Sequence, residues 1–307
     1  MKRKPQQQRG AAILLAMLIV TLVATLAAGM QWRQWRLLQQ ESAARAQSQT
    51  AWVLVGALDW ARLILREDAR STGNALLVDH LGEPWAVPLQ EAKLSSFLSA
   101  DALASAGQDE AYLSGRIIDA QSKINLTNLV LSQTGQGTLS APAYASLAQL
   151  YQQLNLPEAE LKAWTDKWLQ AKEPVFLRPQ SLEQLAWLGV PPRTLALLAP
   201  YVTVLPQPTP INLNTASATV IAASVPGIDR AQAQHLVTLR ATAPFQNVDE
   251  AMKALGHGIF LGTANYSVSS QYFEVQGRLR LGDWVLVESS LVQRVGIDVK
   301  TLWRRRL

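Results

Sequence analysis

The chain has 307 residues and 49% of them are apolar, which is enough to build one large core or two smaller ones. Its formal net charge is +5, but four of its 28 basic residues precede Ala11, and without these four the remaining 24 face 23 acidic residues. A nearly neutral body argues against a dedicated binder of nucleic acid. The absence of cysteine excludes disulfides and cysteine-ligated metals.

The N-terminus combines a basic stretch with a long apolar one. Residues 1–10 read MKRKPQQQRG, and the twenty residues from Ala11 to Met30 carry no charge. Twenty helical residues span about 30 Å, the thickness of the hydrocarbon core of a bilayer. Basic residues on the N-terminal side place that end in the cytoplasm. A membrane anchor is therefore expected over this stretch.

The helical pattern continues beyond Met30. The residues are mostly good helix formers, and apolar ones such as Leu54, Leu58 and Leu65 recur at spacings of three, four and seven. We expect one helix over 11–65, apolar all round in its first half and amphipathic in its second. A single-pass anchor with a linker helix would have the same pattern.

The order of basic leader, glycine, apolar helix and amphipathic stem resembles the N-terminus of type IV prepilins. That resemblance implies that a membrane peptidase cuts after Gly10 and that the new N-terminal residue, Ala11, is N-methylated. Most members have glutamate at the fifth mature position, which is Leu15 here. Its supposed partner is the N-terminal amine of a neighbouring subunit, and the protein K family of type II secretion pseudopilins lacks it.

The body supports the same resemblance. The segments DHLGEPWAVPL and SGRIIDAQSKINLTNLV are similar to protein K sequences, with a strand expected over 112–119 and a polar loop over 119–128. Helical signals dominate from Ala141 to about Leu261, and strands then flank a turn at Gly282-Asp283. The expected fold is α+β and type IV pilin-like, with a long N-terminal helix, an antiparallel sheet and a large inserted all-helical domain.

These patterns divide the chain into five parts. They are a leader (1–10), a transmembrane and stem helix (11–65), a first pilin-like α/β part (66–130), an inserted helical domain (131–265) and a second pilin-like β part (266–307).

Residues 211–255 suggest a different function, because they resemble the helix-hairpin-helix unit of competence-type DNA-binding proteins. Such a hairpin holds a phosphate on backbone N–H groups and needs a second glycine where this chain has Asp229. The charges of the segment also cancel, so its affinity for phosphates should be poor. A membrane-anchored DNA-binding protein stays the alternative, and a structural role for this unit is favoured.

Neither an enzyme nor a metal site is indicated by the motifs. Six carboxylates are the best candidates for hydrolytic chemistry, but they form no set of nucleophile, base and orienting group, and most are interpreted as solvated helix faces or loop polar groups. They are Asp59, Glu67, Asp68, Asp79, Asp119 and Glu274. Asp119, Asn125 and Asn128 are weak calcium candidates, calcium being known among pseudopilins, and turn capping is the other interpretation.

The resemblance implies a non-enzymatic minor pseudopilin that caps the tip of the periplasmic pseudopilus and supports export of folded proteins. The implied partners are minor pseudopilins of the I, J and H types, the major pseudopilin, the prepilin peptidase and inner-membrane lipid, with no nucleic acid and no cofactor other than calcium. The implied location is a Gram-negative inner membrane, with a cytoplasmic N-terminus and a periplasmic body.

Overall fold

The computed structural model describes residues 9–71, 77–93, 111–133, 136–170, 178–256, 261–281 and 284–307. The first eight residues of the expected leader and the turn expected at Gly282-Asp283 lie outside these ranges. The chain divides into two compact units, Met1–Val53 and Leu54–Leu307. Each unit is described by itself.

Helix α1 (Arg9–Ser71) is continuous and runs past Leu65, where the sequence pattern was expected to end it. In the first unit, the most apolar 18-residue window of the stretch Ala11–Glu41 has a mean hydropathy of 2.7, and every residue of the stretch is exposed. In the second unit, Leu54, Leu58 and Leu65 are fully buried. These leucines follow the helical repeat of 3.6 residues, so they form one face of the helix.

The second unit contains a five-stranded sheet of order β1-β2-β9-β10-β11, in which every pairing is antiparallel. The strands are β1 (Leu89–Lys93), β2 (Ala111–Asp119), β9 (Tyr272–Leu281), β10 (Trp284–Val295) and β11 (Asp298–Arg306). The expected strand over 112–119 is confirmed as β2, and the expected hairpin as β9–β10. Strand β11 had not been singled out, because four of its nine residues are lysine or arginine.

The C-terminal part of α1 packs against the sheet through Leu58, Ala61 and Leu65, which share a cluster with Phe273 and Val292. Trp85 closes this cluster from the short 3₁₀ helix η1 (Pro84–Ala86), with its ring edge-on to Phe273 at 5.1 Å.

Glycine permits the close approach of α1 to the strands. Gly115 and Gly277 are directly opposed on β2 and β9. A Cβ at Gly277 would lie 2.7 Å from Leu54 Cδ1, and one at Gly115 would lie 2.8 Å from a backbone oxygen. Any side chain at these positions would therefore push the helix or the neighbouring strand away.

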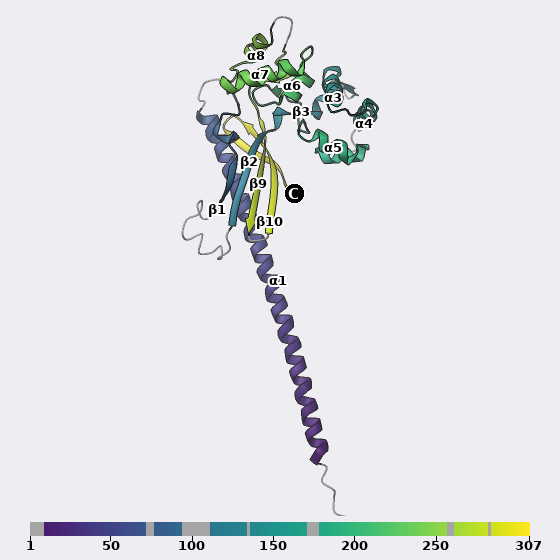
Figure 1. The fold of residues 1–307 in the computed structure, drawn as a ribbon, viewed down its shortest axis with the longest axis vertical. Helices are drawn as coiled ribbons and strands as arrows, with labels where there is room; N and C mark the ends of the chain where they lie inside the picture. The colour runs from purple at the N-terminus through teal and green to yellow at the C-terminus, as the bar shows by residue number, and fades with distance from the viewer. Residues whose placement is uncertain are drawn as a thin grey trace, which may run out of the picture. The chain divides into compact units, whose positions relative to one another are not determined.

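Most remaining helices lie between β2 and β9 in sequence, and Figure 1 shows them grouped beyond one end of the sheet. They are α3 (Ala141–Gln153), α4 (Glu158–Gln170), η5 (Leu182–Leu188), α5 (Pro192–Leu198), α6 (Ala218–Ser224), α7 (Arg230–Thr242) and α8 (Val248–Leu255). Their core is a cluster separate from that under α1 and includes Leu147, Trp164 and Leu236.

Short strands add to this helical insertion. Strands β3 (Ile124–Asn125) and β6 (Val202–Thr203) pair in parallel, as do β7 (Ile211–Asn212) and β8 (Tyr266–Ser267). Strands β4 (Val130–Gln133) and β5 (Gln136–Leu139) form a hairpin. Two-residue strands show no alternation, so the sequence pattern did not reveal them. The α+β fold with a long helix, an antiparallel sheet and a helical insertion is confirmed.

Candidate functional site

The residues that the resemblance assigns to processing lie at the start of α1. Gly10 and Ala11 are helical, and Leu15 lies one turn further along with 61% of its surface exposed. The two polar side chains between Ala11 and Met30, Thr21 and Thr25, each donate to the carbonyl three residues earlier at 2.9 Å. No polar side chain of this stretch therefore needs water, which suits a helix in lipid.

Aromatic residues follow the apolar stretch directly. Trp32 and Trp35 are both more than half exposed, and their ring centroids lie 5.5 Å apart. Arg36 places its guanidinium 5.7 Å from the centre of the Trp32 ring. Tryptophan and arginine at the end of an apolar helix are typical of the membrane–water interface.

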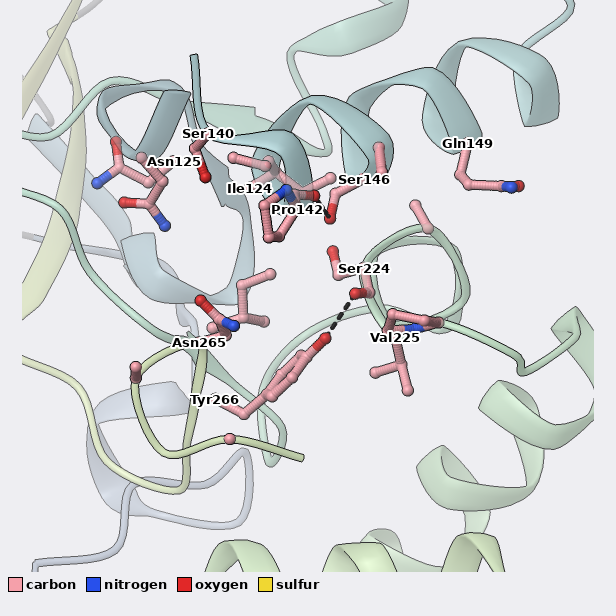
Figure 2. A pocket seen from close by; sticks show the side chains of 18 of the residues that line it. Ile124, Asn125, Ser140, Pro142, Ser146, Gln149, Ser224, Val225, Asn265 and Tyr266 are labelled. Atoms are coloured by element: carbon pink, nitrogen blue, oxygen red, sulfur yellow. Dashed lines mark hydrogen bonds between the residues drawn. The ribbon is translucent and has the colours of Figure 1, made fainter. Parts of the chain in front are cut away.

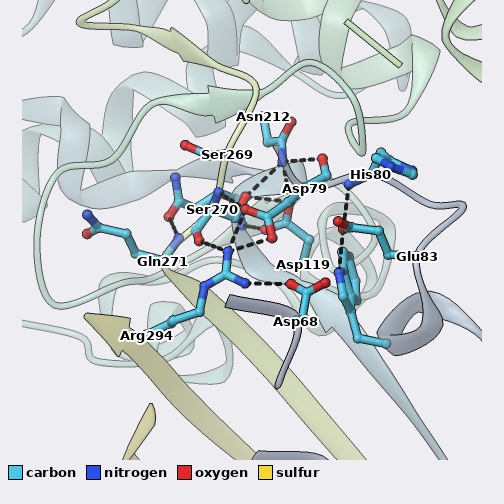
Figure 3. A network of polar contacts seen from close by, with 12 residues as sticks. Asp68, Asp79, His80, Glu83, Asp119, Asn212, Ser269, Ser270, Gln271 and Arg294 are labelled. Atoms are coloured by element: carbon cyan, nitrogen blue, oxygen red, sulfur yellow. Dashed lines mark hydrogen bonds and ion pairs between the residues drawn. The ribbon is translucent and has the colours of Figure 1, made fainter. Parts of the chain in front are cut away.

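A buried polar junction lies at the other end of α1 (Figure 3). Arg294 of β10 is 2% exposed, and its guanidinium bonds the carboxylate of Asp68 in α1 at 2.8 Å and that of Asp79 at 2.5 and 2.6 Å. It also donates to the carbonyl of Ser270 at 2.9 Å. Asp79 is fully buried and accepts the backbone N–H of Ser270. One arginine thus ties the end of α1 to two segments of the sheet region.

Asp119 extends the junction into the insertion. It ends β2, is 2% exposed, and accepts hydrogen bonds from Ser270 Oγ at 2.6 Å and from Thr215 Oγ1 at 2.5 Å. Asn212 of β7 donates to the same carboxylate at 3.1 Å and to the carbonyl of Asp79 at 3.1 Å. Because Asn212 and Thr215 open the helix-hairpin-helix-like segment, this network joins the sheet to the insertion.

Burial removes water from the carboxylates of the junction and disfavours their charged forms. Burial raises the pKa of Asp119 to about 6 and that of Glu83 to about 7, despite the hydrogen bonds that each accepts. Burial also raises the pKa of Asp68 and of Asp79, although Arg294 acts in the opposite direction on both. The network therefore favours proton uptake as the pH falls.

Oxygen atoms of Asp68, Asp79 and Glu83 lie within 4.8 Å of one another, a spacing that suits a cation. The guanidinium of Arg294 already bonds the first two. Glu83 accepts hydrogen bonds from Trp85 Nε1 at 2.6 Å and from the backbone of His80 at 2.9 Å. The positive partner in this cluster is thus the arginine.

The interpretation as a solvated helix face was wrong for Asp68, whose side chain is 11% exposed. The loop polar groups Asp79 and Asp119 are buried, at 0% and 2% exposed. A signal was present in the sequence at Arg294. It occupies the same face of β10 as Val292, which is fully buried. An arginine on the inward face of a strand requires buried carboxylates, although the strand pattern alone does not say which ones.

The calcium candidates make separate sets of contacts. Asp119 bonds the junction residues, whereas Asn125 Oδ1 accepts the N–H groups of Thr127 and Leu205, and Asn128 Oδ1 accepts that of Thr209. Asp119 and Asn125 cap the short 3₁₀ helices η3 (Ala120–Ser122) and η4 (Leu126–Leu129), so the interpretation of these two as turn caps is confirmed. Coordination of a cation would require these oxygens to give up their present partners.

In the helix-hairpin-helix-like unit, side chains of the unit itself occupy the position at which a DNA-binding hairpin would hold a phosphate. Asp229 is the N-cap of α7, and its side chain accepts a hydrogen bond from the backbone N–H of Gln232 at 2.8 Å. The backbone N–H of Asp229 in turn donates to the side-chain oxygen of Gln232 at 2.9 Å. This capping box occupies N–H groups that would bind a phosphate. Arg240 is buried and donates to the carbonyl of Leu213. One of the three basic residues of the unit is therefore unavailable to DNA.

Comparisons with known proteins agree with the resemblance. The family model for type II secretion system protein K matches residues 211–263. Type II secretion system protein K of Pseudomonas aeruginosa is 29% identical, over 94% of this chain and 89% of that one. Its counterpart from Klebsiella pneumoniae is 28% identical, over 79% of this chain and 78% of that one.

A solved structure supports the fold. A chain of the crystal structure of the GspK-GspI-GspJ complex from the type 2 secretion system of enterotoxigenic Escherichia coli matches with a TM-score of 0.65 and 18% identity, covering 87% of this chain and 99% of that one. The two relatives extend far beyond the segment that the family model matches, so the resemblance to protein K of type II secretion systems is confirmed over most of the chain.

Proposed function

We propose that the chain is a minor pseudopilin that α1 anchors in the inner membrane and that caps the tip of a periplasmic pseudopilus. The observation that carries the proposal is the stretch Ala11–Met30, which is uncharged, exposed at every residue and free of polar side chains that need water. Such a surface needs lipid or other apolar helices around it. The role is structural and involves no catalysis.

The tip position follows from Leu15. In the pilin-like family, a carboxylate at the fifth mature position pairs with the N-terminal amine of a neighbouring subunit. A buried carboxylate without this partner is costly, and leucine avoids that cost. A chain with leucine here offers nothing to the amine of a subunit above it, so it suits the first position of a filament.

The proposed partners are the minor pseudopilins of the I, J and H types, the major pseudopilin, the prepilin peptidase and lipid. Support for two of them comes from the structural relative, which was crystallised as a GspK-GspI-GspJ complex. The basic residues before Ala11 favour a cytoplasmic N-terminus and therefore a periplasmic body.

N-terminal sequencing of the membrane-extracted protein tests the processing step. We expect N-methylalanine at Ala11 in the wild type and an intact leader, with loss of secretion, in Gly10→Val. Gly29→Ala is the matched control, because a Cβ at Gly29 meets nothing within 4 Å. Normal processing and secretion in Gly10→Val would contradict the proposal.

The tip position has its own test. Since the chain has no cysteine, Ala196→Cys on the exposed face of α5 introduces a single site for gold labelling. We expect one label at one end of each sheared pseudopilus. Labels distributed along the filament would contradict a tip position and leave the processing result untouched.

A further inference from the structure

The face of the sheet that points away from α1 carries a cluster of basic side chains. Gly277 of β9 lies against Leu54 of α1, so residues 276, 278 and 280 of the same strand point to the opposite face. The pairing of β2 with β9 places residues 112, 114 and 116 on that face as well. The basic side chains gathered there, which we call the basic face, are Lys93, Arg116, Arg278 and Arg280.

The basic face has more positive than negative charge. Two acidic residues share it, Glu91 and Glu274, so four basic residues against two acidic ones leave a net charge of +2 among the described residues. By contrast, the whole chain after residue 10 has 24 basic and 23 acidic residues. Like charges on neighbouring strands repel one another and lower stability. Their concentration on two central strands favours a partner of opposite charge.

Arg278 lies in the middle of this face without a partner. Its register neighbours are Ser114 on β2 and Val287 on β10. Its side chain is exposed and, within the described part of the chain, makes no hydrogen bond and no ion pair. Arg116 donates from Nε to Oε1 of Gln276 at 2.8 Å, and this neutral amide leaves the charge of the arginine unbalanced. Two guanidinium groups can therefore bond carboxylates of a partner.

The same face shows how it holds a carboxylate. Glu91 of β1 accepts a hydrogen bond from Arg280 Nε at 2.9 Å, and both side chains are partly exposed. This hydrogen bond lowers the pKa of Glu91. The guanidinium of Arg280 also lies over the ring of Tyr112, 4.2 Å from its centre, which fixes its orientation. A carboxylate of a partner would meet Arg278, two residues before Arg280 on the same strand, in the same way.

Apolar side chains continue this face onto β10. Val285 is 47% exposed and lies opposite Arg280, and the half-buried Val287 lies opposite Arg278. Arginine beside exposed apolar side chains is typical of protein–protein interfaces. Neither β2 nor β9 contains tryptophan, the residue that is enriched where a protein meets the headgroups of a membrane. A protein surface therefore suits this face better than a lipid surface.

Other arrangements fit less well. The same face of a second copy of this chain would bring like charges together, which is unfavourable. The insertion has a pocket of about 880 Å³, but its described lining residues include no lysine, arginine or histidine. Figure 2 shows that its labelled polar side chains are hydroxyls and amides. An acidic segment would gain no counter-charge in that pocket.

We propose that the basic face docks an acidic surface of another pseudopilin subunit, with Arg116 and Arg278 bonding its carboxylates. The proposal rests on the proposed role as a minor pseudopilin, because rigid central strands suit a constant partner in an assembly better than exported proteins of varied charge. It does not depend on the tip position. Arginine binds carboxylates through two parallel hydrogen bonds, which adds specificity to the attraction.

A direct test measures binding of the full chain in detergent micelles to purified I-, J- and H-type subunits, each alone and all together. The double change Arg116→Glu with Arg278→Glu should weaken binding to at least one of them by at least about tenfold, because it reverses both charges. Arg116→Lys with Arg278→Lys keeps both charges and should weaken it by less than about threefold. The wild-type interaction should weaken with added salt, and that of the glutamate variant much less.

A matched control reverses two charges elsewhere. Arg193→Glu with Lys253→Glu, at exposed positions of α5 and α8, changes the net charge by the same amount and should bind as wild type does. Chemical unfolding checks that each variant is folded, and Arg278→Gln alone, which should weaken binding several-fold, replaces a double variant that is not. Unchanged binding in the glutamate variant, or an equal loss in the control, would overturn the proposal.

The identity of the partner is tested in cells. A photo-reactive amino acid at Val285 should cross-link to another pseudopilin, and the product should disappear in Arg116→Glu with Arg278→Glu. A cross-link to an exported protein instead would overturn the proposal, as would binding to phosphatidylglycerol vesicles that the glutamate variant loses. Processing after Gly10 is followed in the same extracts. Processed protein without a cross-link contradicts the basic face alone, whereas unprocessed protein contradicts the proposed function.

Discussion

Helix α1 contains two apolar stretches that differ in what covers them. Within Ala11–Met30 no residue is buried, and the apolar side chains surround the helix on all sides. Between Leu54 and Leu65 the buried residues form one face, and polar ones such as Asp59 and Arg62 lie between them. A stretch that is apolar all round needs an external apolar medium, whereas a single apolar face needs only the protein's own sheet.

The two stretches also differ in charge. The stretch Ala11–Met30 has no titratable side chain. The C-terminal end of α1 contributes Asp68 to the buried junction, where Arg294 neutralises it. Packing and electrostatics therefore both fix the second stretch to the body, and neither acts within the first. Four predictions test this difference.

The largest effect is expected from Arg294→Met. This change leaves Asp68 and Asp79 buried without their positive partner, which should lower the free energy of unfolding of the body by about 3–5 kcal/mol. Chemical unfolding of the full chain in micelles, followed by tryptophan fluorescence, measures it. Arg306→Met, at an exposed position of β11, is the control and should change stability by less than about 0.5 kcal/mol. Equal effects would mean that the buried ion pairs do not hold α1 to the sheet.

Leucine-to-alanine changes in the two stretches compare them directly. Leu58→Ala removes a fully buried side chain and should lower the free energy of unfolding by about 2–5 kcal/mol. Leu22→Ala, in the same helix at an exposed position, should leave the unfolding of the body unchanged and weaken retention in the membrane only slightly. The same unfolding experiment and a membrane fractionation check both outcomes. Destabilisation of the body by Leu22→Ala would contradict the conclusion that only the second stretch of α1 contributes to the stability of the body.

Sequence patterns predicted the elements whose periodicity is long and regular. The leucine spacing in α1 and the alternation in β9 each reflect one buried face, so burial could be inferred from position. The family-like segment from Asp79 to Leu89 was recognised, and its Trp85 lies in the core. Strand β11 was missed because its inward Val299 is surrounded by exposed or half-exposed residues.

The polar junction could not be predicted because its members are far apart in the sequence. Asp79, Asp119 and Arg294 each have an ordinary local context, and only the antiparallel pairing of β2, β9 and β10 brings them together. Charged residues are exposed to solvent in most proteins, so these three side chains were expected to lie at the surface. The pocket of about 880 Å³ in the insertion was missed for the same reason, since its lining residues come from five separate segments of the chain.

The junction predicts a pH dependence that the apolar stretch cannot have. The pKa of Asp119 is about 6 in the folded state and 3.8 in the unfolded reference, so the folded state binds the proton more tightly. Its contribution to stability is therefore smallest above pH 6 and increases as the pH falls toward 4. Between pH 7 and pH 5, wild type should gain about 1 kcal/mol relative to Asp119→Asn.

The measurement is the free energy of unfolding of both proteins at the two pH values, and the difference between them isolates Asp119 from the other titrating groups. Glu83→Gln is a second comparison, because the pKa of Glu83 is raised to about 7 and its contribution has the same sign. Membrane retention, which depends on a stretch without titratable groups, should not change over this range. The assigned direction would be contradicted if the free energy of unfolding of wild type, relative to that of Asp119→Asn, were lower at pH 5 than at pH 7.

The smallest effect is expected in α7, a helix that neither lipid nor the sheet covers. Asp229→Ala removes the side-chain half of its capping box and should cost about 0.5–1 kcal/mol, whereas Asp229→Asn keeps an N-cap acceptor and should cost less. Asp229→Gly also restores the glycine of DNA-binding hairpins. Because Arg240 stays buried against Leu213, we expect that variant to bind duplex DNA no better than wild type at physiological salt. A micromolar, salt-sensitive complex formed by Asp229→Gly alone would mean that the capping box, more than the missing positive charge, separates this unit from its DNA-binding counterparts.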